Sequence, residues 1–396
     1  MNPSSQVYSD ELYRKQGLTF VIFMALGNFF CNYAQYQLSP ISLRIMEQYH
    51  LTDVQFATVF SSVQMPSIFL GFLMGPVVDK LGPKKVILIG MIVSIIGGAI
   101  RTFFHSFTGL SIGMPLCGVG GGMLIICISK VIGIYIDSEK TSTMAGVIFT
   151  GSSAAMLVGI GTTAFFTSVQ TAFLVSLIAL IIVTILWIIV IKELPPRNVS
   201  DTHVRLKEGI VIAGKSKIVW MGALTAAAVL ASNLIIMEFL PQALQTRGYS
   251  ETAAGWMTAV MMAGCVIGTL FGMRTTSKMK RRTLLTINCI CIAVLGSVGW
   301  LFPLILAIIS FILVGSALGM TFAAIASLPV YDKKLGVKYA GTGNGIITSV
   351  QMIGSIILSS YVIVPLAKGN FYTMFILSGI STILGLICVL FLPKDI

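Results

Sequence analysis

The sequence has 396 residues, of which 56% are hydrophobic and only 10% are charged, and its mean hydropathy is +0.94. Soluble domains carry about 25% charged residues because their surface must be hydrated. This composition therefore excludes a water-soluble protein and leaves no room for a separate soluble enzyme domain. The net charge of +12, from 26 Lys and Arg against 14 Asp and Glu, would suggest nucleic acid in a soluble protein. In a membrane protein it indicates topology, and we expect no nucleic-acid partner.

Twelve hydrophobic runs predict twelve transmembrane helices, because about 20 consecutive apolar residues span a bilayer. The runs lie near residues 17–41, 53–76, 85–104, 108–135, 142–165 and 170–191, and then near 217–240, 252–273, 284–301, 303–328, 341–366 and 371–392. A long polar stretch separates the two sets of six. We therefore expect an all-α integral membrane protein with two pseudo-symmetric six-helix bundles, divided into an N-terminal bundle (1–191), a cytoplasmic linker (192–216) and a C-terminal bundle (217–396).

The basic residues predict which ends of these helices face the cytoplasm. If the N-terminus is cytoplasmic, 22 of the 26 Lys and Arg residues fall on the cytoplasmic side, and the others are Arg44, Arg101, Arg247 and Lys368. Basic residues are retained in cytoplasmic loops. We therefore expect a multi-pass protein of the cell membrane with both termini in the cytoplasm.

A weak internal repeat relates the two sets of helices. When the sequence is shifted by 198 residues, segment 50–53 falls on segment 248–251, and the basic loop after the second helix falls on the loop after the eighth. Two halves repeated in the same orientation are related by an axis along the membrane normal. Folds of this design place the substrate between the halves, near the middle of the membrane.

The loop after the second helix carries a motif. Over residues 75–85 it is GPVVDKLGPKK, which resembles the G-x-x-x-D-x-x-G-x-[RK] loop of the major facilitator superfamily, with its four positions occupied by Gly75, Asp79, Gly82 and Lys84. The resemblance extends over the whole chain in helix count, linker and termini. It implies a transporter that works by alternating access, in which these four residues take part in gating. It also implies that Asp79 meets the start of the eleventh helix, near 339–342, when the cytoplasmic side is closed.

Two features typical of proton-driven drug exporters in this family are missing. The fourth helix has Met114 where such exporters often carry an Arg ahead of a G-x-G, and the fifth helix lacks the proline of their glycine motif. Both differences count against a proton-driven multidrug exporter. The loop after the eighth helix has Ser277 at the position equivalent to Asp79, which predicts that the two halves close asymmetrically.

Ionisable residues inside a predicted span are unfavourable in lipid and therefore point to function. Lys130, in the inner half of the fourth helix, could bind a carboxylate or another anion, or its ammonium could extend to the interface. Glu238, in the outer half of the seventh helix, could carry a proton, bind a cationic group or form a gate. The 198-residue shift brings Arg44 close to Glu238, and we expect an ion pair between them at an outer gate. Arg101 is expected at the outer membrane interface.

Side chains with amides recur at helical spacing in three predicted spans. The polar residues are Asn28, Asn32, Gln35 and Tyr36 in the first helix, Asn233 in the seventh, and Asn344 and Gln351 in the eleventh. Residues three or four apart share one face of a helix. Amides that face lipid lack partners, whereas amides that line a hydrated cavity can bind a polar solute. We expect these residues and Lys130 to bind substrate; the alternative for the amides is hydrogen bonding between helices.

Together these features predict a secondary or facilitative transporter of a small polar organic solute. An organic anion is favoured because the charges inside the membrane are mainly positive. The alternative is an amphipathic or cationic compound with Glu238 as its counter-charge. A coupling ion or an exchanged solute could be a further partner.

The seven cysteines and three histidines form no metal-binding or catalytic pattern. We therefore expect no cofactor, no metal and no enzymatic activity, and a monomer in the lipid bilayer.

Overall fold

A computed structural model describes residues 10–73, 75–136, 141–194, 206–332 and 335–393. Within these ranges the chain is helical and forms no strand. The N-terminal half consists of α1 (Asp10–Tyr36), α2 (Ser42–Tyr49), α3 (Asp53–Ser62), α4 (Met65–Leu73), α5 (Gly75–Leu81), α6 (Pro83–Phe103), α7 (Phe107–Tyr135), α8 (Thr141–Thr162), the turn η2 (Thr163–Phe165) and α9 (Val169–Val190).

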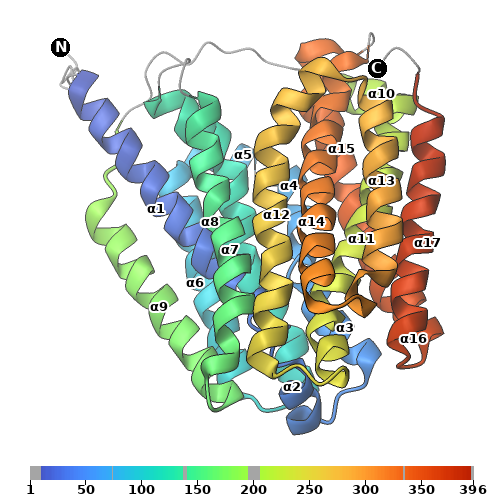
Figure 1. Cartoon of the computed structure of the whole chain (residues 1–396). Helices are drawn as coiled ribbons and strands as arrows, with labels where there is room; N and C mark the ends of the chain where they lie inside the picture. Colours follow the sequence, from blue (N-terminus) through green and yellow to red (C-terminus); the bar gives the residue numbers. More distant parts are fainter. Residues whose placement is uncertain (1–9, 74, 137–140, 195–205, 333–334, 394–396) are drawn as a thin grey trace, which may run out of the picture.

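The C-terminal half begins after the connector. It consists of α10 (Leu206–Gly214), α11 (Lys217–Thr246), α12 (Glu251–Lys278), α13 (Arg281–Val298), η3 (Gly299–Leu301), α14 (Leu304–Ser327), η4 (Leu328–Tyr331), α15 (Gly336–Ile356), η5 (Ile357–Ile363), α16 (Val364–Ala367) and α17 (Phe371–Leu390). Figure 1 shows the two halves side by side, with α1 and α9 at one flank and α13 and α17 at the other.

Both ends of the chain lie at the same end of the molecule in Figure 1. We name it the termini end, and we name the opposite end, where α2 lies, the far end. The long helices run between the two ends, so that α6 starts at the termini end and α7 starts at the far end.

Eleven helical stretches among the described residues are long and apolar enough to cross a membrane by length and composition. They correspond to eleven of the twelve predicted spans, and the all-α membrane fold is confirmed. The remaining predicted span, 53–76, is interrupted between α3 and α4. The interruption is at Gln64, ahead of Pro66 in the first turn of α4. Proline has no N–H to donate but is tolerated in the first turn of a helix, so a new helix starts there.

A second irregular segment lies where α15 continues into the π-helix η5. Pro365 follows it in α16, and a proline cannot donate to the carbonyl four residues earlier. The wider π turn accommodates this missing bond, and such turns are frequent at functional sites. Ser359 and Ser360 of η5 are fully buried, and Ser360 faces the N-terminal half.

The internal repeat has a counterpart in the packing of the helices. A Cβ atom on Gly118 would stand 1.8 Å from the Val63 carbonyl oxygen, and one on Gly315 would stand 1.9 Å from the Met261 carbonyl oxygen. Val63 and Met261 are 198 residues apart, which is the repeat interval. Small residues permit such close contacts between membrane helices. Gly118 and Gly315 are 197 residues apart, one fewer than the repeat interval, so each half contains a close helix contact of the same kind at a nearly equivalent place.

Candidate functional site

A cavity of about 300 Å³ lies between the two halves. Its walls come from α1, α4, α7 and α8 on one side and from α11, α12, α14 and α15 on the other. The polar side chains that line it are Asn32, Gln35, Tyr36, Gln64, Ser67, Ser152, Asn233 and Gln351. Because both halves contribute, a solute bound here would contact groups that move relative to one another when the halves rock.

Five of the eight predicted substrate-binding residues line this cavity: Asn32, Gln35, Tyr36, Asn233 and Gln351. Two of them are held by their own neighbours. The Gln35 amide donates to the Phe60 carbonyl at 2.9 Å, and the Asn32 amide donates to the Asn28 carbonyl at 2.7 Å. These bonds fix the orientation of the amides before a solute arrives.

The other three predicted residues are not among those that line the cavity. The Asn28 amide donates to the Ile148 carbonyl at 3.0 Å and so joins α1 to α8. The Asn344 amide donates to the Ala326 carbonyl at 2.9 Å and joins α15 to α14. Both therefore make the interhelical bonds that were the alternative interpretation. The Lys130 ammonium donates to the Val78 carbonyl of α5 at 3.0 Å, toward the termini end rather than the cavity.

Gln64 was not predicted, yet it is a central part of the site. Its Oε1 atom is buried without a hydrogen-bond partner, and so is Oδ1 of Asn233 on the opposite wall. Buried polar atoms are normally paired, so these two unpaired amide oxygens, each on a residue that lines the cavity, are acceptors to which a solute or water could donate after a small turn of the side chain. The helix interruption at Pro66 was the signal in the sequence, because interrupted helices expose backbone and side chains only beside a cavity.

The described residues that line the cavity include no charged side chain. Besides the amides and hydroxyls, its walls carry Phe322 and three methionines, Met156, Met262 and Met352. The predicted anion-binding role of Lys130 therefore has no support from the lining of this cavity. The chemistry offered to a solute is hydrogen bonding to neutral groups beside polarizable apolar surface.

Contacts between the halves close the cavity toward the far end, and we name this set the far gate. It consists of a hydrogen bond from Ser39 to the Met237 carbonyl, an ion pair of Arg44 with Glu251, an edge-to-face contact of the Phe56 and Phe239 rings with centroids 6.2 Å apart, and the Ser61 and Ser360 hydroxyls at 3.0 Å. These hydrogen bonds, together with one from the Gln242 amide to the Met46 sulfur, join the two halves at this end.

The predicted ion pair between Arg44 and Glu238 is not formed. Arg44 instead pairs with Glu251 of α12 and also donates to the Phe166 carbonyl at 2.7 Å. Glu251 lies at the partly exposed start of α12, whereas Glu238 lies inside α11 with no exposed surface. The long Arg44 side chain thus extends toward the partly hydrated carboxylate.

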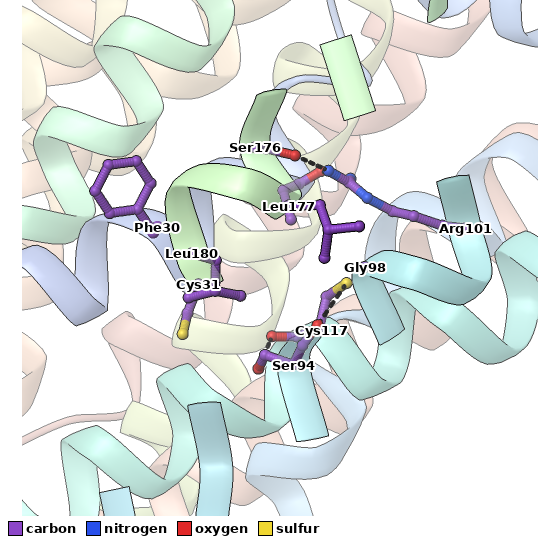
Figure 2. A pocket seen from close by; sticks show the side chains of 10 residues that line it. Phe30, Cys31, Ser94, Gly98, Arg101, Cys117, Ser176, Leu177 and Leu180 are labelled. Carbon is purple, nitrogen blue, oxygen red and sulfur yellow. Dashed lines mark hydrogen bonds between the residues drawn. The ribbon is translucent and has the colours of Figure 1, made fainter. Parts of the chain in front are cut away.

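Arg101 is also not an interfacial anchor, because its side chain is enclosed by protein and is only 1% exposed. Its guanidinium donates to the Ala34 carbonyl at 2.7 Å, to Gln37 at 2.8 Å and to the Ser176 hydroxyl at 2.6 Å, and it stacks on the Phe173 ring at 4.3 Å. Figure 2 shows it at a second, much smaller cavity within the N-terminal half. Arg101 joins α1, α6 and α9 behind the wall that carries Gln35.

The motif lies at the termini end and comprises α5, Gly82 and the start of α6. Gly82 has φ +80°, and a Cβ there would stand 2.1 Å from Oε1 of Glu193. The Glu193 carboxylate accepts a hydrogen bond from the Lys84 backbone, and the Lys84 carbonyl accepts from the indole of Trp187 at 3.2 Å. The side chain of Asp79 and the surroundings of Gly75 lie outside the described part of the structure, so their predicted gating roles stay predictions.

Comparisons with known proteins point to the same family that the sequence motif resembles. Residues 20–359 match the sequence profile of the Major Facilitator Superfamily. The chain is 26% identical to a hexuronate transporter of Bacillus subtilis (strain 168) over 242 residues, 58% of this chain and 56% of that transporter. It is 24% identical to the multidrug resistance protein MdtH of Blochmanniella floridana over 334 residues, 83% of this chain and 82% of that protein. The match to the first relative thus spans little more than half of that protein, and the two names point to different solutes.

Proposed function

Because this chain belongs to the Major Facilitator Superfamily and is a membrane transporter rather than an enzyme, we propose that its cavity binds a small, hydroxylated organic solute through neutral amide groups. The solute crosses the membrane when the two halves rock about it and expose the cavity to each side in turn. The observation that carries this proposal is the pair of unpaired amide oxygens, one from each half, on side chains that line the cavity.

The size and chemistry of the cavity support a small solute. Its volume of about 300 Å³ is at the lower end of the range for small-molecule pockets, roughly 300 to 1,000 Å³. Amide oxygens at Gln64 and Asn233 accept hydrogen bonds, so the solute should present hydroxyl or N–H groups to both walls. A sugar-like compound has such groups on all sides and can bind both halves at once.

An organic anion is the second candidate, and the hexuronate transporter among the relatives favours it. A hexuronate combines hydroxyl groups with one carboxylate, and amide N–H groups of Asn32 or Gln351 could donate to that carboxylate. An amphipathic or cationic compound is the third, supported by the name of the MdtH relative and by the methionines of the cavity. In that case Glu238 would need to be reached from the cavity.

We infer that the protein is a multi-pass component of the cell membrane with the termini end in the cytoplasm. The distribution of basic residues supports this orientation. Since the far gate is closed, the conformation described here is then the one in which access from the outside is blocked. Fusing a reporter that works only in the cytoplasm to the C-terminus tests the orientation, and an inactive fusion would contradict it.

Binding to purified protein tests the proposed solute class. A thermal-shift screen would compare neutral sugars and polyols, hexuronates and other organic anions, and amphipathic cations, and hits would then be tested by counterflow in liposomes. We expect neutral hydroxylated compounds or hexuronates to stabilise the protein. Removing one amide partner, as in Asn233→Ala, should weaken binding about 5- to 10-fold, which corresponds to about 1 kcal/mol for one net hydrogen bond.

The control variant is Asn344→Ala, which removes an amide of the same chemistry from outside the cavity. It should leave the affinity for the hit unchanged. If only amphipathic cations bind, or if Asn233→Ala and Asn344→Ala have equal effects, the proposed solute class is wrong.

A further inference from the structure

Glu238 is buried in a way that an ionised carboxylate does not tolerate. It has no exposed surface, and neither of its oxygen atoms has a hydrogen-bond partner in the described part of the chain. It lies five residues after Asn233, which places it about 7.5 Å further along α11 toward the far end. Glu238 therefore sits in the layer of protein that separates the cavity from the far end.

The residues beside Glu238 make the contacts that close the far gate. The Met237 carbonyl accepts the hydrogen bond from Ser39, and the Phe239 ring packs against Phe56 of α3. Glu238 is thus enclosed because the halves meet on both sides of it. When the halves separate at this end, the same carboxyl group becomes accessible to water.

Besides its burial, Glu238 has a negative charge on the opposite half, that of Asp53 in the first turn of α3. Asp53 and Phe56 are three residues apart and share one face of α3, and Phe56 packs against the residue next to Glu238. Burial and a like charge both disfavour the ionised form of a carboxyl group.

Two cations at the far end are bonded to other groups. Arg44 of α2 is paired with Glu251 of α12, and Arg247, just after α11, donates to the Trp300 and Phe302 carbonyls. Lys368 is exposed and precedes Gly369, which lies close to Asp53. The other titratable side chains near this end include Glu47, the buried Tyr49 and the exposed His50 at α2, the exposed His105 that stacks on Tyr49, Tyr249 ahead of α12, Tyr361 of η5 and Tyr372 of α17.

We propose that Glu238 is a proton-binding site of the far gate, protonated while the gate is closed and ionised when it opens. On opening, the carboxyl O–H bond breaks, the proton passes to water at the far side, and the carboxylate that remains is hydrated. Closing reverses the step and takes up one proton from the far side. Closure of the gate and the binding of one proton are therefore the same event. This inference rests on alternating access, but it is independent of which solute the cavity binds.

The opening of the far gate should consequently depend on pH. Spin labels at Thr108→Cys and Leu306→Cys, exposed positions in the first turns of α7 and α14, would report the separation of the halves at the far end in a variant without the native cysteines. Double electron–electron resonance should show the short distance at about pH 5 and a growing long-distance population toward about pH 9, as expected for an acid that is ionised only in the open state.

Three variants test the assignment to Glu238. Glu238→Gln keeps the shape of the side chain but cannot ionise, so the gate should stay closed at every pH. Asp53→Asn removes the neighbouring negative charge, so the gate should open at a lower pH than in the wild type. Glu47→Gln removes an exposed carboxylate of α2 outside the gate and should not change the response. The proposal would be overturned if Glu238→Gln showed the same pH response as the wild type. It would also be overturned if the wild type showed no pH response.

A second measurement does not depend on the behaviour of the labelled variants. Infrared spectroscopy should detect the carbonyl band of a buried, protonated carboxyl group in unlabelled wild-type protein. This band should shift in Glu238→Asp and be absent in Glu238→Gln.

If the far gate responds to sodium at constant pH instead of to protons, the site binds a metal cation and the proposal is wrong. Solute binding by Glu238→Gln, measured by thermal shift, separates a failure of the proton site from a failure of the proposed solute class.

Discussion

At Gly82 two independent constraints act on one residue. Its backbone has φ +80° and ψ 157°, a region that is essentially restricted to glycine, and the carboxylate of Glu193 occupies the place where a Cβ would stand. Strained backbone of this kind costs of order 1 to 3 kcal/mol. We therefore expect Gly82→Ala to lower the stability of the protein by at least about 1 kcal/mol and to displace Glu193 from the turn.

The melting temperature of the detergent-purified protein measures this effect. Gly345→Ala is a suitable control, because Gly345 is helical and no atom lies within 4 Å of a Cβ built there. Alanine is favoured over glycine in a helix by about 1 kcal/mol, so this variant should be equally stable or more stable. If both variants melted at the wild-type temperature, the turn would not constrain Gly82.

Arg101 offers a test of how a buried cation is held. Its guanidinium donates at once to the Ala34 carbonyl, the Gln37 side chain and the Ser176 hydroxyl. The ammonium of a lysine is a more compact donor and cannot reproduce this planar fork. Arg101→Lys should leave at least one buried acceptor unpaired and lower stability by about 1 to 3 kcal/mol. A melting temperature equal to that of Arg14→Lys, a change at an exposed position, would contradict this.

Residue types alone predicted some of these roles and not others. The amides of Gln35 and Gln351 were predicted to line the cavity, because their spacing from other amides and their chemistry are local properties of a helix. The partners of Arg44 and Arg101 were not, because they depend on which side chains the folded halves bring within reach. Gln64 was missed since a single amide, without a second at helical spacing, looks like any polar residue in an apolar run.

At the level of elements, eleven of the twelve predicted spans appear as helices long enough to cross a membrane. Hydrophobic length predicts them well, because a lipid-facing segment must pair its own backbone groups. The span at 53–76 is the exception: its composition is apolar throughout, but Pro66 interrupts the helical hydrogen bonding. Hydropathy measures the affinity of a segment for lipid and does not detect such a break when it faces a cavity.

The ion pair that joins α2 to α12 should bias the far gate toward the closed state. Its side chains are 34% and 23% exposed, and pairs of this kind typically contribute about 0.2 to 1 kcal/mol. Glu251→Gln should therefore increase the open-to-closed ratio about 1.5- to 5-fold. The distance between spin labels at the far end measures that ratio, and Glu47→Gln is the control on the same surface. An unchanged ratio would show that the pair adds nothing to closure.

At the scale of the whole molecule, the two halves were predicted from the helix count and a weak repeat, and the contacts across them agree with that symmetry in one detail. Ser39 and Met237, which touch in the far gate, are 198 residues apart. Residues separated by the repeat interval can meet only near the axis that relates the halves. The sequence could not indicate which end would be closed, because both conformations use the same helices and differ only in the relative position of the halves.

A covalent link across the far gate tests whether transport requires the halves to separate there. The hydroxyls of Ser61 and Ser360 are 3.0 Å apart and fully buried, and cysteine Cβ atoms in a disulfide are about 3.5 to 4.5 Å apart. The double variant Ser61→Cys with Ser360→Cys should therefore form a disulfide when oxidised in a background without the native cysteines. Oxidised protein in liposomes should still bind its solute, because the cavity is intact.

Transport by the oxidised variant should nevertheless fall to the background level, and reduction should restore it. Each single variant under the same oxidant controls for damage by the reagent and should keep its activity. The opposite result, full counterflow with the cross-link complete, would mean that the solute leaves without separation of α3 from η5. In that event the far gate would be a fixed contact about which the halves rotate. The solute would then have to leave the cavity by another route between the halves.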